Sequence, residues 1–287
     1  EDSVASLRHY GHLRSRRLEW FDGKVALVSG ASRGVGFATA RALVMRGASV
    51  AITARGEERL ARAKADLERL GGDVVAVSGD VGVRKDAERM VHAAVDTFGR
   101  LDVLVNNAGV SMRGHFADLS PAVCRQVAMT NFVGCLNLTK AAMDHLQASR
   151  GSVVFISSIA GLFGLPGASV YCATKKALTG LAESLRLELI PKGVHVGIVY
   201  LGFTEHDPEK RILAADGSLV PPDRPAHHTQ ADAARQIVGL IHRRKRQWVM
   251  TPAGKMGWLA YRISPWLVEK VIVWAQTSEW GIFKRFS

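Results

Sequence analysis

The chain has 287 residues, of which 47% are hydrophobic and 22% are charged, and this composition is ordinary for a soluble globular chain without internal repeats or low-complexity linkers. Its formal net charge of +12 and its pI of about 10.0 are not ordinary. Such a positive field suits anionic ligands, acidic lipids or nucleic acid, although charge alone identifies none of them.

Three cysteines, Cys124, Cys135 and Cys172, all fall in predicted helices. An odd number of cysteines in such positions argues against a disulfide framework and indicates a reducing, cytoplasm-like compartment. We interpret Cys172 as a packing residue and not as a nucleophile.

Residues 1–23 precede the first predicted strand and form an N-terminal extension that contains several arginines. The chain begins with Glu1 and not with Met, which leaves open that a targeting or anchoring segment precedes it.

The first predicted strand, residues 24–29, leads into a glycine-rich turn and then into an alanine-rich helix at 37–46. The turn reads Gly30-Ala-Ser-Arg-Gly-Val-Gly36, which differs from the generic Gly-x-Gly-x-x-Gly fingerprint. Glycines let backbone N–H groups approach a phosphate, and a helix N-terminus adds partial positive charge. The segment predicts a phosphate site, and a glycine turn without a ligand is the alternative.

Valine-rich strands and helical stretches alternate along the rest of the chain, which predicts an α/β fold: a doubly wound parallel sheet of the Rossmann type with helices on both faces. A single doubly wound sheet would use nearly all the predicted strands, so we expect one domain at 24–251 with extensions at 1–23 and 252–287. The further strands are expected at 50–53, 74–78, 103–106, 153–157, 194–200 and 248–250, and the further helices at 57–70, 84–98, 121–147, 171–190 and 230–242.

Tyr171 and Lys175 lie four residues apart in a predicted helix, so they share one helical face. A positive charge close to a phenol favours its deprotonated form and makes it a usable acid or base. A solvated helix face is the alternative for this pair taken alone.

Taken together and in this order, Ser29-Gly-Ala-Ser-Arg-Gly-Val-Gly36, Asn106-Asn-Ala-Gly109, Ser158 and Tyr171-Cys-Ala-Thr-Lys175 resemble the classical short-chain dehydrogenase/reductase family. The resemblance covers about residues 24–251. It implies an oxidoreductase that transfers a hydride between a nicotinamide and a carbonyl or alcohol substrate, with no metal.

The same resemblance implies the roles of four catalytic residues. Tyr171 is the expected general acid or base, Lys175 supports it and holds the nicotinamide ribose, and Ser158 binds the substrate oxygen, with Ser157 as the alternative. Asn131 matches the family's fourth member, which holds a water for proton relay, and a purely structural role is the alternative.

The cofactor-binding residues that the resemblance implies come from the glycine loop, the ends of later strands and the catalytic helix. Asp80 could equally be a turn residue. The full set is Gly30, Ser32, Arg33, Gly34, Val35, Gly36, Arg55, Asp80, Val81, Asn107, Ala108, Gly109, Tyr171, Lys175, Gly202 and Thr204.

The second predicted strand ends in Thr53-Ala54-Arg55, where related NAD-dependent enzymes carry an acidic residue at the position of Ala54. Two guanidinium groups, those of Arg55 and of Arg33 in the glycine loop, would favour a 2′-phosphate. We therefore expect NADP(H) in preference to NAD(H), which favours the reductive direction. An Arg55 that merely caps a helix surface is the alternative.

After the sixth strand the sequence reads Leu201-Gly-Phe-Thr-Glu-His206, whereas many family members have Pro-Gly followed closely by Thr. The usual Thr position falls on His206, and Thr204 is the expected substitute. The Leu-Gly version resembles the 11β-hydroxysteroid dehydrogenase-like branch, which hints at a bulky apolar substrate. The irregular stretch at about 203–229 is the expected substrate lid, and its histidines lack the spacing of metal ligands.

The C-terminal extension, residues 252–287, contains four tryptophans but no apolar run of the roughly 20 residues that span a membrane. We expect it to pack against the pocket or another subunit, and a membrane-surface role ranks behind these. The basic run Arg243-Arg-Lys-Arg246 ends a predicted helix, where cations complement the helix dipole, and no nucleic-acid motif accompanies it.

These expectations combine into a reductase or dehydrogenase acting on a small-molecule carbonyl or alcohol, assembled as a homodimer or homotetramer, with no nucleic-acid partner. Two other classes stay open: a catalytically silent dinucleotide-binding regulatory protein, and a membrane-surface or scaffold component that acts through its C-terminal extension.

Overall fold

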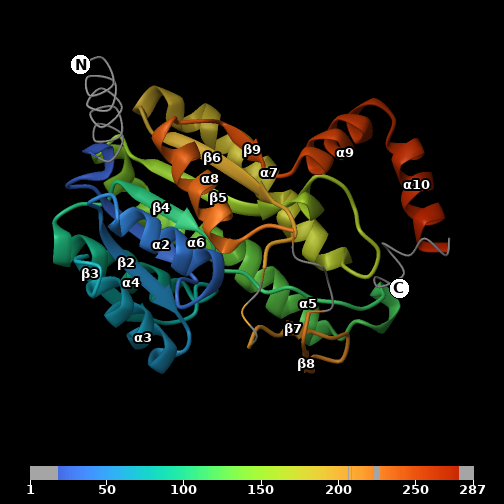
Figure 1. Cartoon of the computed structure of the whole chain (residues 1–287), viewed down its shortest axis with the longest axis horizontal. Coiled ribbons are helices and arrows are strands. Elements are labelled where there is room, and N and C mark those ends of the chain that lie inside the picture. Colours follow the sequence, from blue (N-terminus) through green and yellow to red (C-terminus); the bar gives the residue numbers. More distant parts are fainter. Residues whose placement is uncertain (1–18, 206, 208, 223–226, 278–287) are drawn as a thin grey trace, which may run out of the picture.

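A computed structural model describes residues 19–205, 207, 209–222 and 227–277 (Figure 1). Their centre is a seven-stranded sheet, ordered β3-β2-β1-β4-β5-β6-β9, in which every neighbouring pair is parallel. The strands are β1 (Val25–Ser29), β2 (Ser49–Ala54), β3 (Val74–Ser78), β4 (Val103–Asn106), β5 (Ser152–Ser158), β6 (His195–Leu201) and β9 (Gln247–Val249).

Helices cover both faces of this sheet, as expected from its valine-rich and uninterrupted strands. Successive side chains of a strand point to opposite faces, so Val25 and Leu27 of β1 join one core cluster while Ala26 and Val28 join the other. The helices of the domain are α2 (Gly34–Val44), α3 (Glu57–Glu68), α4 (Arg84–Phe98), α5 (Pro121–Ala128), α6 (Gly134–Ala148), α7 (Ser169–Leu189) and α8 (Gln230–His242).

The doubly wound α/β fold is therefore confirmed, with two local differences from the sequence-based expectation. Helix α2 begins at Gly34, directly within the glycine loop, and not at residue 37. The helix expected over 121–147 is divided by a π-helical turn, Met129–Val133, which joins α5 to α6.

The expected lid contains a small antiparallel pair, β7 (Ile212–Leu213) and β8 (Leu219–Val220). A parallel bridge joins Leu213 to Met112, in the segment that follows β4. The backbone N–H of Arg113 donates to the carbonyl of Leu213 at 2.8 Å, and the N–H of Leu213 donates to the carbonyl of Ser111 at 3.0 Å. The described part of the lid is thus fastened to the rim of the domain.

The two ends of the chain differ in how much the structure describes. Residues 1–18 of the N-terminal extension lie outside the described residues, and Glu19–Phe21 form a 3₁₀ turn whose Phe21 is buried. In the C-terminal extension, α9 (Pro252–Ile263) and α10 (Pro265–Thr277) project from the body at the end that also carries β7 and β8 (Figure 1).

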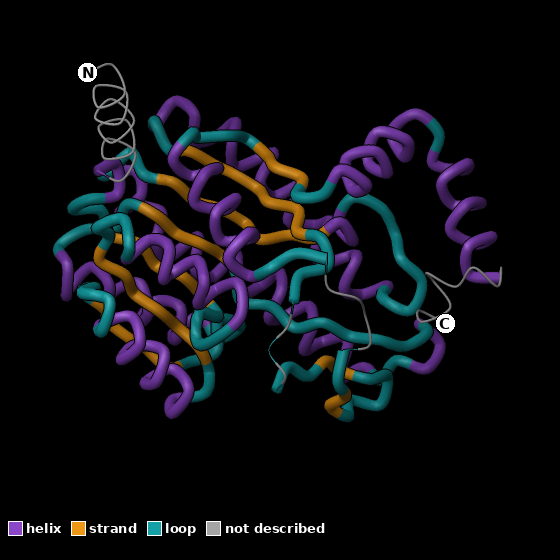
Figure 2. The backbone as a smooth tube through the Cα atoms, viewed as in Figure 1, coloured by secondary structure: helices purple, strands orange, loops and turns teal. Residues whose placement is uncertain are grey.

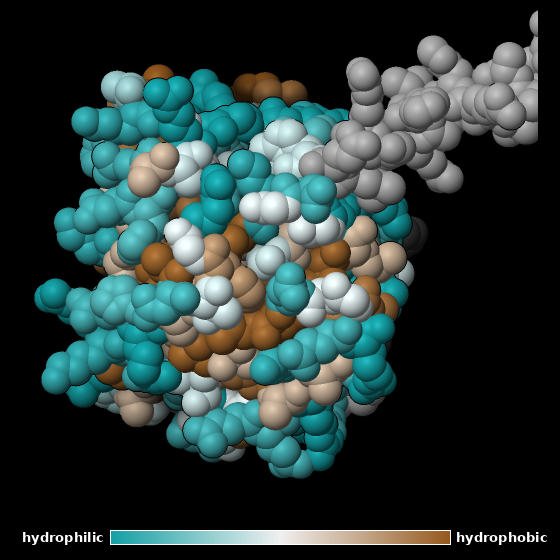
Figure 3. Space-filling view, turned by 90° about the vertical axis from the view of Figure 1, so that its left-hand side faces the viewer, coloured by the Kyte–Doolittle hydropathy of each residue, from teal (hydrophilic) through white to brown (hydrophobic). Residues whose placement is uncertain are grey.

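Figure 2 shows most long loops gathered at that same end, beyond the carboxyl ends of the strands. Figure 3 faces the opposite end of the molecule, where hydrophilic residues surround a central hydrophobic area. Among the described helices none is long and apolar enough to cross a membrane.

The buried side chain of His195 makes the stability of the fold depend on pH. His195 begins β6 and is 7% exposed; its Nε2–H donates to the carbonyl of Lys245 at 2.9 Å, and its Nδ1 lies 3.2 Å from Oγ of Ser152. Burial is the largest cause that lowers the pKa of His195 to about 4, and the charges of Arg244 and Arg186 act in the same direction.

We predict that His195 contributes to acid sensitivity. Between its unfolded pKa, about 6.5, and its folded pKa, the unfolded chain binds a proton that the folded chain does not, so stability falls as the pH falls, by up to about 3 kcal/mol. Urea unfolding at pH 7 and pH 4.5 should show a smaller loss for His195→Gln than for the parent chain. The exposed His115→Gln should match the parent, and an equal loss in all three proteins would contradict the prediction.

Candidate active site

The glycine loop between β1 and α2 packs so closely at Gly30 and Gly36 that these two positions have no room for a side chain. Gly30 and Gly34 have φ of +64° and +63°, in the left-handed region that favours glycine. A Cβ on Gly36 would lie 2.4 Å from the carbonyl oxygen of Gly30 and 2.4 Å from Nδ2 of Asn107. The N-terminus of α2 is therefore left open to an incoming ligand.

The loop after β4 is tied to the glycine loop by hydrogen bonds. Nδ2 of Asn107 donates to the carbonyls of Ser29 and Gly30, at 2.8 and 3.2 Å. Oγ of Ser29 accepts from the backbone N–H groups of Asn107 and Ala108, both at 3.0 Å. These bonds fix the two loops relative to each other at the carboxyl edge of the sheet.

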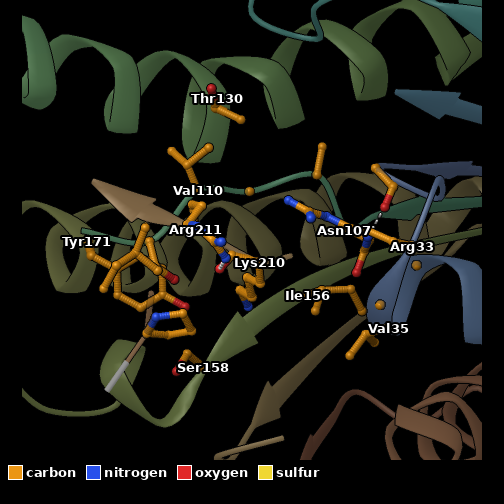
Figure 4. A pocket seen from close by; sticks show the side chains of 18 of the residues that line it. Arg33, Val35, Asn107, Val110, Thr130, Ile156, Ser158, Tyr171, Lys210 and Arg211 are labelled. Atoms are coloured by element: carbon orange, nitrogen blue, oxygen red, sulfur yellow. Dashed lines mark hydrogen bonds between the residues drawn. The ribbon is translucent and has the colours of Figure 1, made fainter. Parts of the chain in front are cut away.

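One cavity of about 650 Å³ opens along this edge. In Figure 4, Tyr171 and Ser158 lie toward one end of it and Arg33, Val35 and Asn107 toward the other. Apart from Asn131, all the residues expected from the sequence to form the site line this cavity: Gly30, Ser32, Arg33, Gly34, Val35, Gly36, Arg55, Asp80, Val81, Asn107, Ala108, Gly109, Ser158, Tyr171, Lys175, Gly202 and Thr204.

Tyr171 and Lys175 both belong to α7 and meet the cavity from one side. Lys175 is 6% exposed, and its Nζ donates to the carbonyl of Ile156 at 2.9 Å and lies 5.8 Å from the centre of the Tyr171 ring. A buried ammonium thus stands beside a half-buried phenol.

The two adjacent serines at the end of β5 have different surroundings. Ser157 is buried, and its Oγ donates to the carbonyl of Lys175 at 2.9 Å. Ser158 is half-buried, and its Oγ accepts from the N–H of Ala160 at 3.2 Å, so its hydroxyl hydrogen is available to another acceptor.

Asn131 lies in the π-helical turn and is fully buried, behind the wall of the cavity. Its Oδ1 accepts from the N–H of Val110 at 2.8 Å, and its Nδ2 donates to the carbonyl of Val110 at 2.9 Å and to Oγ1 of Thr174 at 3.3 Å. The amide therefore holds the segment that lies in front of it.

The far end of the cavity carries basic groups. Arg33 and the exposed Arg55 both line it, and Nη1 of Arg33 is buried without a hydrogen-bond partner among the residues that the structure describes. An unpaired buried guanidinium N–H is costly unless an acceptor such as a phosphate reaches it. Together with the open glycine loop, this donor set fits a dinucleotide phosphate.

Other expected residues have local bonds. Oδ1 of Asp80 accepts from the N–H of Gly82 at 2.8 Å, which makes Asp80 a turn residue as well as a lining residue. Thr204 is buried, and its Oγ1 donates to the carbonyl of Gly202 at 3.2 Å. His206, on which the family's usual Thr position falls, lies outside the described residues.

Several lining residues were not identified from the sequence. Lys210 and Arg211 of the lid, Arg113 and Thr130 all border the cavity. In the view of Figure 4, Lys210 and Arg211 lie between Tyr171 and Asn107. The run Glu209-Lys-Arg-Ile-Leu213, in which charged residues precede apolar ones, was the available signal for this part of the lid.

Thiol and metal chemistry find little support in the described residues. Burial raises the pKa of Cys172, and it raises the pKa of Cys135 to about 11, so both thiols stay protonated at neutral pH. Within the described ranges, no group of three or more His, Cys, Asp or Glu residues could hold a metal ion.

A doubly wound parallel sheet with a cavity at its carboxyl edge is the architecture of Rossmann-type proteins, and comparison with known proteins identifies the family. The family model described as short chain dehydrogenase matches residues 24–216. The chain belongs to this family of oxidoreductases, whose members bind a nicotinamide dinucleotide.

Two curated relatives illustrate the similarity. The 11-beta-hydroxysteroid dehydrogenase-like 4A protein of Arabidopsis thaliana is 40% identical over 190 residues, which make up 66% of this chain and 63% of that protein's length. The uncharacterized oxidoreductase YxnA of Bacillus subtilis is 31% identical over 279 residues, 92% of this chain and 76% of that protein. The first name agrees with the branch expected from the Leu201-Gly202 motif.

A solved structure shows the same fold. It is a short chain dehydrogenase/reductase from Burkholderia phymatum in complex with NAD, 23% identical, with a TM-score of 0.77 over 86% of this chain and 95% of that one.

We predict that Gly36→Ala disrupts the glycine loop, because the added Cβ would overlap a backbone oxygen that cannot move independently. It should lower stability by about 1–3 kcal/mol and abolish NADPH binding, as measured by urea unfolding and fluorescence titration. Gly239→Ala is the matched control: Gly239 lies within α8 with no heavy atom within 4 Å of its Cβ position, and its replacement should stabilise the chain by about 0.5–1 kcal/mol. NADPH binding retained by Gly36→Ala would contradict this assignment of the phosphate site.

Proposed function

We propose that this chain is an NADP(H)-dependent oxidoreductase that interconverts a carbonyl compound and its alcohol, with Tyr171 as general acid or base. The observation that carries the proposal is that Tyr171, Ser158 and the buried Lys175 line the same cavity as the glycine loop and Arg33. A proton-transfer group and a dinucleotide phosphate site in one cavity are what this reaction requires.

A bound nicotinamide supplies or accepts the hydride, and the protein manages the proton at the substrate oxygen. In reduction, the hydroxyl of Tyr171 gives its proton to the carbonyl oxygen, and the ammonium of Lys175 stabilises the phenolate that remains. The hydroxyl of Ser158 donates to the same oxygen. Ser157 is less suited, because its Oγ is engaged with the carbonyl of Lys175.

Asn131 acts as a positioning residue in this proposal. Its amide bonds both backbone groups of Val110, so it fixes the segment beside the catalytic helix and leaves little capacity for a water relay.

The preference for NADP(H) is supported by the charges around the far end of the cavity. The residue at the end of β2 is Ala54, which offers no carboxylate to a ribose hydroxyl, and Arg55 follows it. Arg33 adds the unpaired Nη1 described above. Both guanidinium groups suit a 2′-phosphate.

The substrate we propose is bulky and mainly apolar. Apolar residues of the lid and of the loops before α7 line the cavity, among them Leu165, Ala168, Phe203 and Leu213. Three of these, Leu165, Ala168 and Leu213, share hydrophobic clusters with Tyr171. A homodimer or homotetramer is proposed as well, because α7 and the turn after it expose Leu187 and Ile190, which are 75% and 61% accessible.

We expect Tyr171→Phe to lower the rate of NADPH oxidation by at least about 100-fold, because the proton donor is removed. NADPH binding should be nearly unchanged. Activity should be measured with a panel of small ketones, quinones, acyl thioester ketones and steroid-like ketones, and Tyr261→Phe, the same exchange on α9, is the matched control.

Full activity in Tyr171→Phe would overturn the mechanism. If the parent chain binds NADPH but reduces no compound of the panel, a catalytically silent regulatory protein becomes the better interpretation.

The proposed preference for NADP(H) rests on Arg55, so removal of this side chain should impair the reaction with NADPH and not that with NADH. Arg55→Ala should reduce kcat/KM for NADPH by about 10- to 100-fold, since a charge-assisted contact to the 2′-phosphate is lost, and should leave NADH nearly unaffected. Arg62→Ala is the control, because Arg62 lies on α3, the helix that follows Arg55, and is paired with Glu58 at the surface. Equal losses with both cofactors, or tight NADH binding by the parent chain, would contradict the preference.

A further inference from the structure

Helices α9 and α10 form an arm that is apolar on its outside; we call residues 252–277 the C-terminal arm. Its inner side touches the loop that follows Ser158: Cβ atoms on Gly254 and Gly257 would lie 3.0 Å from Ile159 and 3.1 Å from Phe163. Its outer side is exposed, with eight large apolar side chains between 54% and 77% accessible: Met256, Leu259, Ile263, Trp266, Leu267, Val271, Val273 and Trp274.

Cations accompany the aromatic rings of the arm. Cζ of Arg262 lies 5.2 Å from the centre of the Trp258 ring, and Nζ of Lys270 lies 4.0 Å from that of Trp266. The sequence of the arm contains three cations, Lys255, Arg262 and Lys270, against the single acid Glu269. Indole rings with basic heads beside them are the side chains that lie at the boundary between lipid tails and headgroups.

The lengths of the two helices favour a surface position over a membrane span. They contain 12 and 13 residues, which correspond to about 18 and 20 Å, whereas the hydrocarbon core of a bilayer is about 30 Å thick.

The exposed face of the C-terminal arm could contact a lipid surface or a second copy of the chain, and its positive charge favours the lipid surface. A second copy would bring the same excess of cations to the contact, and each copy carries a net charge of +12. An anionic surface complements that charge while it accepts the apolar side chains.

We propose that the C-terminal arm docks this protein on the surface of a membrane that contains anionic lipids, with α9 and α10 lying in the headgroup region. The arm lies at the end of the molecule that carries the lid strands β7 and β8 (Figure 1). Docking therefore brings the catalytic end of the cavity close to the lipid.

Co-sedimentation of the full chain with lipid vesicles tests the proposal. The chain should bind vesicles of phosphatidylglycerol and phosphatidylcholine, bind pure phosphatidylcholine vesicles much more weakly, and dissociate partly as the salt concentration rises. Absence of binding to the anionic vesicles at low salt would overturn it.

A matched pair of charge reversals separates docking by the arm from the effect of net charge. Arg262→Glu/Lys270→Glu should lower the partition coefficient by at least about 30-fold, since each cation near an anionic surface contributes about fivefold. Arg62→Glu/Arg69→Glu changes the net charge equally at exposed positions around α3, remote from the arm, and should bind like the parent chain. Equal losses in both double variants would overturn the assignment to the arm.

Trp266→Ala/Leu267→Ala provides a second measurement that does not alter charge. It should weaken vesicle binding while the mass of the protein in sedimentation equilibrium stays unchanged. A change of mass together with intact vesicle binding would overturn the proposal and identify the arm as an interface between copies.

Discussion

The parallel pairing of β1, β4 and β5 is the constraint on which the site depends. Parallel strands end at one edge of the sheet, so the chain segments that follow these three strands must all leave there. The register pairs Val28 with Val105 and Asn106 with Phe155, which brings the glycine loop level with the loop after β4. The glycine loop and Ser158 therefore line one cavity although they are far apart in sequence.

Side-chain amides hold the loops that follow the strands. Backbone groups of loops at a sheet edge have no partners in the strand ladder, so side chains can bond them. Asn107 bonds the carbonyls of the glycine loop, and Asn131 bonds both backbone groups of Val110. Asn131 can do so from a π-helical turn, where the extra residue in the turn reorients the side chains that follow. The loops around the cavity are therefore held before any ligand arrives.

The sequence predicted the sheet because its strands are short, valine-rich and bounded by turn residues, and it predicted the phosphate loop because glycine spacing reports backbone geometry directly. It left Ser157 and Ser158 open, since both faces of β5 are buried and hydrophobicity cannot tell which face a serine meets. The π-helical turn was missed because Met129-Thr-Asn-Phe-Val133 contains residues that suit an α-helix equally well. Two-residue strands such as β7 have no period to detect, and the arm's outward face depends on contacts that no local pattern encodes.

The burial of Lys175 lowers the stability of the fold, and the proposed proton transfer gives a reason for a charged residue at this position. An ammonium has three donors, and burial of its charge is costly unless hydrogen bonds and opposite charge compensate. At 6% exposure, Nζ of Lys175 makes one hydrogen bond, to Ile156, and a contact with the face of the Tyr171 ring. A core optimised for stability alone would place an apolar residue at this position of α7. In the proposed mechanism the cost is offset when the phenolate of Tyr171 forms beside Nζ, so the buried ammonium favours the charged state of the phenol that proton transfer requires.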